Sequence, residues 1–392
     1  MSHLRLLFVS WSTVGGSGQS QRQLAAQLAD RGHEVQFLVH DRRSARVMRA
    51  AYGQLSDLSA RLDERAAGRA VGWLRDRPGQ RMRVSEVDGF THHWTPLPQN
   101  ALRSVVESFP PDAVIVSSVD RWVWRRIHDV CGSRGIPTVL YLREEASLDH
   151  LGTGSIPSLL VANTPSLAAR MEERGFSCAF VPSVVDVSAT ATESSRTSAL
   201  AINPIPLKGS DTVWELARRL PEVPFVVQEG WPLRGPQLED VLRRSAALPN
   251  VEFRRTTEPG PGLYGDARVL LAPYLVDSRP RVVLEAQANG IPVIASDVPA
   301  LVDAIGDGGL VASVDSDDSL DQWVEAVRSL WDDGALYARL SEAARSHAKR
   351  PEVRPESIGE EFERLVHGIV EGHLVPRDSD DDTRPIATKD SV

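Results

Sequence analysis

The chain has 392 residues, which is too many for one ordinary domain and fits two domains of roughly 190 residues each. Hydrophobic residues make up 42% of the chain and charged residues 25%, which excludes a wholly disordered, a collagen-like or a disulfide-scaffold protein. The 44 basic and 53 acidic residues give a net charge of −9, which argues against bulk nucleic-acid binding.

The sequence also predicts the compartment in which the chain works. Its apolar runs are well short of the roughly 18 residues that a membrane span needs, and its start lacks the pattern of a signal peptide. The two cysteines, Cys131 and Cys178, fit core thiols in a reducing environment. We therefore expect a cytoplasmic protein.

In the first half of the chain, short apolar runs alternate with helical patterns. Residues 19–31 carry Leu24, Ala25 and Leu28 at helical spacing and stop at Gly32. This alternation predicts parallel strands joined by right-handed crossovers. The predicted strands are residues 4–10, 34–39, 113–116, 138–141 and 159–162.

The second half repeats this alternation, so the predicted fold class is α/β, with two Rossmann-like, doubly wound parallel-sheet domains facing across a cleft. The predicted strands are residues 199–202, 225–228, 251–253, 269–272 and 292–295, and the clearest helices are residues 211–219, 281–288 and 320–331. Residues 187–198, rich in Ser, Thr and Ala, are the predicted linker between domains at 1–186 and 199–350. The acidic tail 376–392 cannot bury a core and is predicted to be disordered. Ligands of such sheets bind at the carboxyl ends of the strands, which makes the cleft the expected site.

A glycine-rich loop follows the first strand. Gly15, Gly16 and Gly18 would let backbone amides approach an anion at the start of a helix. Asp41 ends the second strand, where a dinucleotide fold places its ribose-binding acid, so a nicotinamide site is an alternative. The glycines do not fit the G-x-G-x-x-G spacing, and a plain turn is equally compatible with the loop.

A second motif combines two carboxylates with a helix start. Asp277 lies in a loop and Glu285 lies eight residues later in a predicted helix. Ser278 could cap that helix and Pro280 suits its first turn. The amides of residues 281–283 could then hold a pyrophosphate, while Glu285 accepts from the two hydroxyls of a ribose and Asp277 from a sugar beyond the phosphates.

These residues resemble a known family over nearly the whole chain, the retaining GT-B glycosyltransferases of family 4 (group 1). The Asp277–Glu285 spacing is similar to the family's E-x7-E motif, with Asp in first place, and the opening strand, Gly15-Gly16 and residues 31–35 are similar to its amino-terminal pattern. The resemblance implies an acceptor-binding first domain, a donor-binding second domain and a carboxyl-terminal helix at 351–375 packed back on the first domain. It also implies a nucleotide-sugar donor, a sugar moved with retention to an unidentified acceptor, and no metal or other cofactor.

The chain departs from the family at the pyrophosphate site. Members commonly carry Gly-Arg after the first strand of the second domain and a Lys soon after, but here Asn203-Pro204 precedes Lys208. Only three lysines occur in the chain, which favours a role for Lys208 as a point charge on phosphate, helped by Arg279 or Arg281.

A second departure follows the strand at 138–142. Many members have a histidine there, and this chain has Arg143-Glu144-Glu145. Arg143 could contact the donor phosphate or the acceptor and Glu144 could hold a hydroxyl, or the pair could form a salt-bridged strand end. His92 and His93 have no partners at metal-ligand spacing, and we expect no metal.

Together these assignments give a predicted site. The predicted catalytic residues are Lys208, Asp277, Glu285 and Arg143; the donor-binding residues are Gly15, Gly16, Asn203, Arg279, Arg281, Val282 and Val283; and the acceptor-binding residue is Glu144.

The region 42–83 carries 11 arginines against four acidic residues. It could cradle an anionic acceptor, rest on the inner membrane face as a peripheral contact, or form a solvated helix pair. Three rival functions also stay open: a sugar-nucleotide epimerase of the same fold, a nicotinamide-dependent oxidoreductase and a non-catalytic nucleotide-binding scaffold.

Overall fold

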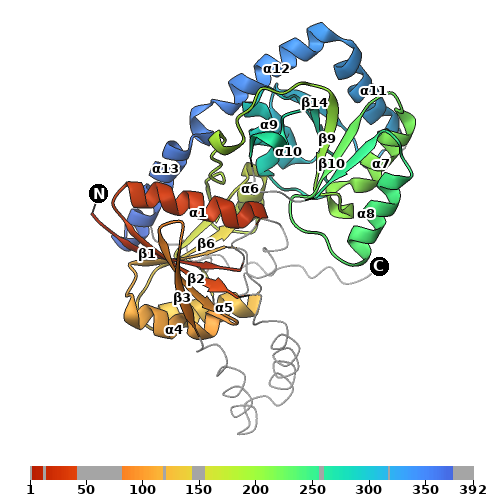
Figure 1. The fold of residues 1–392 in the computed structure, drawn as a ribbon. Helices are drawn as coiled ribbons and strands as arrows, with labels where there is room; N and C mark the ends of the chain where they lie inside the picture. Colours follow the sequence, from red (N-terminus) through yellow and green to blue (C-terminus); the bar gives the residue numbers. More distant parts are fainter. Residues whose placement is uncertain are drawn as a thin grey trace, which may run out of the picture.

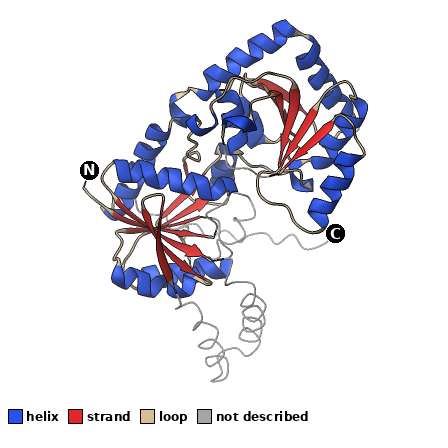
Figure 2. Cartoon of the chain, in the orientation of Figure 1, coloured by secondary structure: helices blue, strands red, loops and turns tan. Residues whose placement is uncertain are grey.

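The computed structural model describes residues 2–11, 15–41, 82–117, 121–143, 155–255, 260–316 and 318–373. Within them the chain forms two α/β units, each with a central sheet between layers of helices (Figures 1 and 2). The predicted fold class is confirmed. Most of region 42–83, residue Glu144 and the acidic tail lie outside the described residues.

The first sheet has eight strands in the order β3-β4-β2-β1-β5-β6-β7-β8. All neighbours pair in parallel except β3 and β4, which form an antiparallel pair at the edge. The strands are β1 (Arg5–Ser10), β2 (Glu34–His40), β3 (Arg83–Val87), β4 (Phe90–Thr95), β5 (Ala113–Ser117), β6 (Thr138–Leu142), β7 (Leu159–Ala162) and β8 (Ala179–Phe180). The helices of this unit are α1 (Gly15–Asp30), α4 (Pro98–Ser108), α5 (Arg121–Gly132) and α6 (Pro165–Glu173).

The second sheet has six parallel strands in the order β11-β10-β9-β12-β13-β14. The strands are β9 (Ser198–Ile202), β10 (Phe225–Gln228), β11 (Val251–Arg254), β12 (Ala267–Ala272), β13 (Val293–Ser296) and β14 (Gly309–Ala312). The helices are α7 (Ser210–Arg219), α8 (Pro236–Ala246), α9 (Arg281–Ala288), α10 (Pro299–Ile305), α11 (Ser319–Asp332) and α12 (Gly334–Ala348). The central strands are buried on both faces, which is why they read as continuous apolar runs in the sequence.

The last helix, α13 (Pro355–Val370), leaves the second unit and lies beside α1 of the first (Figure 1). Its apolar face, with Ile358, Phe362 and Val366, belongs to the same core cluster as Leu24 and Leu28 of α1. The carboxyl-terminal end of the described chain is therefore part of the amino-terminal core. Among the described residues, no helix is both long and apolar enough to cross a membrane.

A buried polar cluster joins α13 to the loop after α1. His33 Nε2 lies 3.1 Å from Glu363 Oε1, and the ligand atoms of His33, Glu363 and His367 all lie within 4.8 Å of one another, close enough to hold a metal ion. However, the main-chain N–H of Leu4 donates to His33 Nδ1 at 3.1 Å, so the proton of the neutral ring is on Nε2 and is donated to Glu363. This pattern favours a hydrogen-bonded clamp over metal ligation through His33.

The buried histidines make stability dependent on pH. Burial lowers the pKa of His33, His92, His93 and His347 below the usual 6.5. Below pH 6.5 the unfolded chain therefore binds more protons than the folded chain, so folding stability is lost as the pH falls through this range. We expect a lower urea midpoint at pH 5.5 than at pH 7.5, and an equal or higher midpoint at pH 5.5 would contradict this.

The two cysteines are confirmed as buried, free thiols. Cys131 and Cys178 are 0% and 8% exposed, and burial raises the pKa of each to about 12. Such thiols stay protonated at neutral pH and are poor nucleophiles.

Candidate functional site

A cavity of about 620 Å³ lies between the two sheets and is lined by residues from both units. The amino-terminal lining includes Gly15, Gly16, Ser20, Arg22, Arg143, Asn163 and Ser183. The carboxyl-terminal lining includes Asn203, Lys208, Gln228, Glu229, Trp231, Tyr274, Ser278, Arg279, Arg281, Val282 and Glu285. Most of these residues follow the carboxyl ends of parallel strands or open the next helix, as expected for ligand sites in doubly wound sheets.

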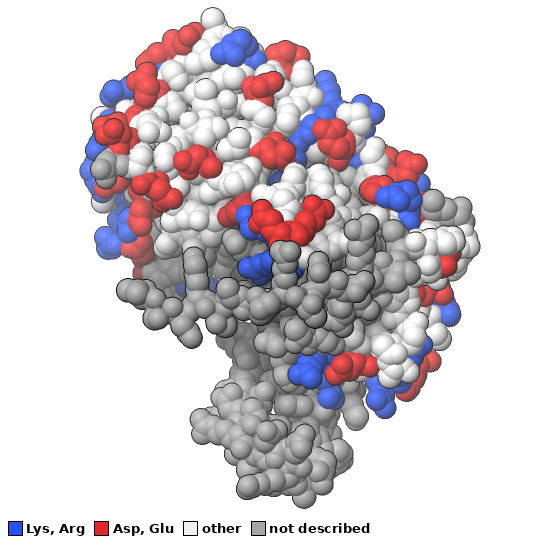
Figure 3. All heavy atoms as spheres, turned by 180° about the vertical axis from the view of Figure 1, so that it is seen from behind, with Lys and Arg blue, Asp and Glu red and all other residues white. Residues whose placement is uncertain are grey.

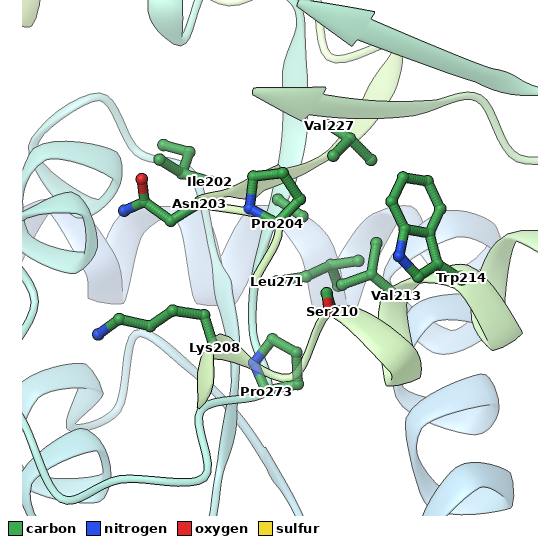
Figure 4. Close-up of a pocket in the computed structure, with 11 residues that line it drawn as sticks. Ile202, Asn203, Pro204, Lys208, Ser210, Val213, Trp214, Val227, Leu271 and Pro273 are labelled. Carbon is green, nitrogen blue, oxygen red and sulfur yellow. The ribbon is translucent and has the colours of Figure 1, made fainter. Parts of the chain in front are cut away.

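Lys208 reaches the cavity from a tight turn after β9. Asn203 directly follows the strand with φ of 65°, and a short 3-10 turn, η4 (Pro206–Lys208), leads to Gly209 and α7. The Lys208 Nζ lies 3.9 Å from the centroid of the Tyr274 ring. In Figure 4 the polar ends of Lys208 and Asn203 point in the same direction, away from the apolar side chain of Trp214. The structure therefore brings these two predicted residues together.

Gly209 makes this turn possible. Its φ is +69°, and a Cβ built there would lie 1.8 Å from the Pro273 carbonyl oxygen. We expect Gly209→Ala to destabilise the chain by more than the roughly 1–2 kcal/mol that a left-handed alanine costs, because the backbone must also move. Urea denaturation measures this. Gly135→Ala is the control, because Gly135 has a similar positive φ of +66° but has open space around the added Cβ. Equal losses in the two variants would contradict the steric argument.

Helix α9 begins beside the cavity without a side-chain cap. Its N-cap residue is Pro280, so the expectation that Ser278 caps the helix is wrong, because Ser278 is two residues too early. Instead, the Ser278 hydroxyl is buried without a hydrogen-bond partner in the described chain and lines the cavity. Arg281 and Val282 line it too, and first-turn amides have no partner within a helix. Val283 does not, because its side chain is 1% exposed in the core and its amide donates to the Pro280 carbonyl oxygen.

Glu285 is the buried carboxylate of the site. Its residue is 6% exposed, the Tyr264 hydroxyl donates to Oε2 at 2.8 Å, and Arg281 Nη2 lies 3.4 Å from Oε1. Burial and this carboxylate raise the pKa of Tyr264 well above its usual value, so the phenol remains a donor. The carboxylate is thus held in a fixed orientation at the cavity wall.

Arg281 spans the two units. Its Nη1 donates to Ser20 Oγ at 2.9 Å, Gln23 Oε1 at 2.7 Å and the Val184 carbonyl oxygen at 3.0 Å. Its side chain packs so close to Gly16 that an added Cβ there would lie 3.2 Å from Cδ. The structure therefore places the side chain of Arg281, a predicted phosphate ligand, against α1. Gly16 has no side chain there, which leaves room for Arg281.

Asp277 is not among the residues that line the cavity. Its Oδ2 accepts from Ser166 Oγ and from Arg170 Nη2, both at 2.9 Å, and its Oδ1 accepts from the main-chain N–H of Ala300 at 2.8 Å. Ser166 and Arg170 belong to α6 of the first unit, so in this structure Asp277 is engaged in a contact between the units.

This contact is expected to hold the two units together. Arg170→Ala removes the ion pair and should let the units separate more often, which small-angle scattering would register as a larger radius of gyration. Arg174→Ala is a control at the end of the same helix, because Arg174 is exposed and the Asp277 carboxylate pairs with Arg170 instead. The same radius of gyration for both variants would show that the Arg170–Asp277 ion pair does not hold the units together.

Of the remaining predicted residues, two line the cavity and one lies outside the described part of the chain. Arg279 lines the cavity and pairs with Asp303 of α10. Arg143 lines the cavity from the amino-terminal side, donating to Ser117 and Ser183. Glu144 lies outside the described residues.

Several cavity residues were not predicted from the sequence, chiefly those at the end of β10 and just after it. Gln228 and Glu229 are 5% and 3% exposed, and Glu229 accepts from the Leu233 N–H and from Arg255 Nε. Trp231 follows them in the cavity wall. Their place directly after a buried parallel strand was the available signal.

Comparisons with known proteins agree on the class. The family model described as Glycosyl transferases group 1 matches residues 215–333. A D-inositol 3-phosphate glycosyltransferase of Corynebacterium kroppenstedtii is 34% identical over 119 residues, which cover 30% of this chain and only 26% of that protein. A GDP-mannose-dependent alpha-(1-6)-phosphatidylinositol monomannoside mannosyltransferase of Mycolicibacterium smegmatis is 28% identical over 71% of this chain and 68% of that protein.

Solved structures show the same fold at low identity. Sucrose-phosphate synthase from Thermosynechococcus elongatus superposes with a TM-score of 0.73 at 13% identity, covering 94% of this chain and all of that one. Anabaena HepE in complex with UDP-glucose has a TM-score of 0.69 at 13% identity, covering 93% and 100%. The chain has the GT-B fold, and residues 215–333 are similar to the group 1 glycosyl transferases. The predicted resemblance to this class is confirmed, and the matched segment lies in the second unit and includes α9 and Glu285, whereas Lys208 precedes it.

Proposed function

We propose that the chain is a retaining glycosyltransferase that moves a sugar from a nucleotide-sugar donor to an acceptor bound in the first unit. The observation that carries the proposal is the convergence of Lys208, the uncapped start of α9 and buried Glu285 on one cavity between the units. A lysine charge and a helix amino terminus suit a diphosphate, and a buried carboxylate suits ribose hydroxyls. The match to group 1 glycosyl transferases supports this choice over an epimerase, an oxidoreductase or a scaffold.

In this proposal the leaving diphosphate is stabilised electrostatically. Lys208 and the first-turn amides of α9 lie where charge develops as the bond between the anomeric carbon and the phosphate oxygen breaks. The acceptor hydroxyl attacks on the face that the diphosphate leaves, and the phosphate oxygen takes its proton, which retains the anomeric configuration. No metal ion is required by this scheme, because the lysine and amides supply the positive charge.

The acceptor is assigned to the first unit. The names of two relatives specify acceptors built on a phosphorylated inositol, which makes a phosphate-bearing polyol a candidate class here. The face of the second unit seen in Figure 3 carries interspersed acidic and basic side chains, which suits a small-molecule enzyme better than a nucleic-acid binder. A cytoplasmic location, with peripheral membrane contact through region 42–83 as the alternative, stays a prediction.

Donor binding is the first test. Titrating the chain with UDP, GDP, ADP and dTDP in a calorimeter should show at least one nucleoside diphosphate binding, in buffer with EDTA as well as with Mg²⁺. Failure of all four to bind would overturn the proposal, and binding that depends on Mg²⁺ would overturn its metal-independent form.

A further inference from the structure

The cavity contains one arginine that differs from the others. Among the residues that the structure describes, four arginines line it, and three of these form ion pairs with carboxylates: Arg22 with Asp88, Arg279 with Asp303 and Arg281 with Glu285. Arg143 forms no ion pair within the described part of the chain. Its positive charge therefore enters the cavity without a counter-charge from those residues.

The Arg143 guanidinium is held firmly in place. Its Nε donates to Ser117 Oγ and its Nη1 donates to Ser183 Oγ, each at 2.9 Å. Its Cζ lies 4.6 Å from the centroid of the Tyr141 ring, and the Tyr141 hydroxyl is fixed by donating to the Val181 carbonyl oxygen at 2.7 Å. Nη2 is buried and has no hydrogen-bond partner among the described residues. Two of the three guanidinium nitrogens, Nε and Nη1, therefore have partners, and Nη2 can donate to a ligand.

Such an arrangement is costly without a ligand. An arginine does not lose its proton in proteins, and a half-buried charge without a counter-charge is disfavoured. Burial, and secondarily the nearby positive charge of Arg281, lower the pKa of Arg143. A carboxylate or phosphate oxygen on Nη2 would supply both a hydrogen bond and a counter-charge.

The position of Arg143 indicates which substrate carries that anion. Its three contacts, Ser117, Tyr141 and Ser183, all belong to the first unit, whereas Lys208 and the start of α9 belong to the second. Resting on the proposed function, which places the donor diphosphate in the second unit, we propose that Arg143 anchors a phosphate or carboxylate group of the acceptor. The acceptor is thus an anionic molecule, and the chain selects it by charge at the position that Arg143 occupies.

A matched set of small molecules tests this on the full chain. The probes are glucose, glucose 6-phosphate, glucuronate and inorganic phosphate, each titrated by calorimetry with and without the best-binding nucleoside diphosphate. We expect at least one anion to bind about tenfold or more tightly than glucose, in line with a charge-assisted bond, and Arg143→Gln to remove most of that difference. The phosphate and carboxylate probes distinguish the two sources of the anion.

The control variants distinguish the effect of losing the positive charge from a general effect on the folded protein. Arg143→Lys keeps the charge and should retain part of the preference for anions. Arg134→Gln, at an arginine of the same unit that pairs with Glu107 and does not line the cavity, should leave the preference unchanged. Wild-type protein without a preference for anions, or Arg143→Gln with the wild-type preference, would overturn the proposal. So would an equal loss of nucleoside diphosphate affinity in Arg143→Gln, because the guanidinium would then serve the donor. If the wild type binds no nucleoside diphosphate but still prefers anions to glucose, only the proposed transfer function would be overturned.

Discussion

Replacing Lys208 with methionine is expected to lower the rate of sugar transfer or donor hydrolysis by about 100-fold or more, the loss typical of removing one stabilising charge from a transition state. Methionine keeps most of the length of the side chain and its packing against Tyr274, so the effect should come from the charge. Turnover with saturating donor is the measurement, because charge on the leaving diphosphate is greatest in the transition state.

Lys349→Met provides the matched control for this variant. Lys349 follows α12, is exposed and does not line the cavity, so turnover should not change. If Lys208→Met retains the wild-type rate while its thermal unfolding is unchanged, Lys208 does not stabilise the leaving group.

Replacing Glu285 with glutamine is expected to weaken donor binding by roughly 10- to 100-fold, the range for losing hydrogen bonds to a charged group. The amide keeps the size of the side chain and can still accept from Tyr264, but it no longer pairs with Arg281 and makes weaker bonds to ribose hydroxyls. The affinity for the best-binding nucleoside diphosphate measures the effect.

Tyr264→Phe is the companion variant. It removes the donor to Oε2 but leaves the carboxylate, so its effect on nucleotide affinity should be smaller than that of Glu285→Gln. A glutamine variant that binds the nucleotide as tightly as the wild type would remove Glu285 from the donor site.

The sequence predicted the strands of both sheets well wherever they are buried on both faces. β1, β5 and β6 appear as unbroken apolar runs because helices cover them on each side. The β3–β4 pair was not predicted, because it is an edge hairpin with exposed and half-exposed residues and charged side chains. The start of α1 was placed too late, because Gly15 and Gly16 read as a loop while the chain folds them into the first helical turn.

The candidate site was predictable where local spacing determines geometry. Glu285 follows from its place one turn into α9, and Lys208 from its place just after β9. The contacts of Asp277 were not predictable, because its partner Arg170 is 107 residues away and belongs to the other unit. The same holds for Arg281, whose hydrogen bond to Ser20 spans 261 residues. Spacing along the chain identifies the residues of a site, and only the fold shows which of them face the ligand and which hold the units together.

The contacts of Asp277 and Arg281 with the first unit bear on the proposed mechanism. Both belong to the segment of the proposed donor site, and both contact the first unit, through α6 and α1 respectively. A donor that binds at α9 would therefore bind directly beside the contacts that hold the units together. This arrangement suits a transferase, because closure around the donor excludes water from the reacting sugar.

The central claim is that this cavity breaks the bond between a sugar and a nucleoside diphosphate. Incubating the wild-type chain and Lys208→Met with a panel of nucleotide sugars, and following the released diphosphate by phosphorus NMR, tests it most directly. We predict release from at least one donor by the wild type and a loss of about 100-fold or more in the variant. Absence of release from every donor, or equal release by both proteins, would contradict the account.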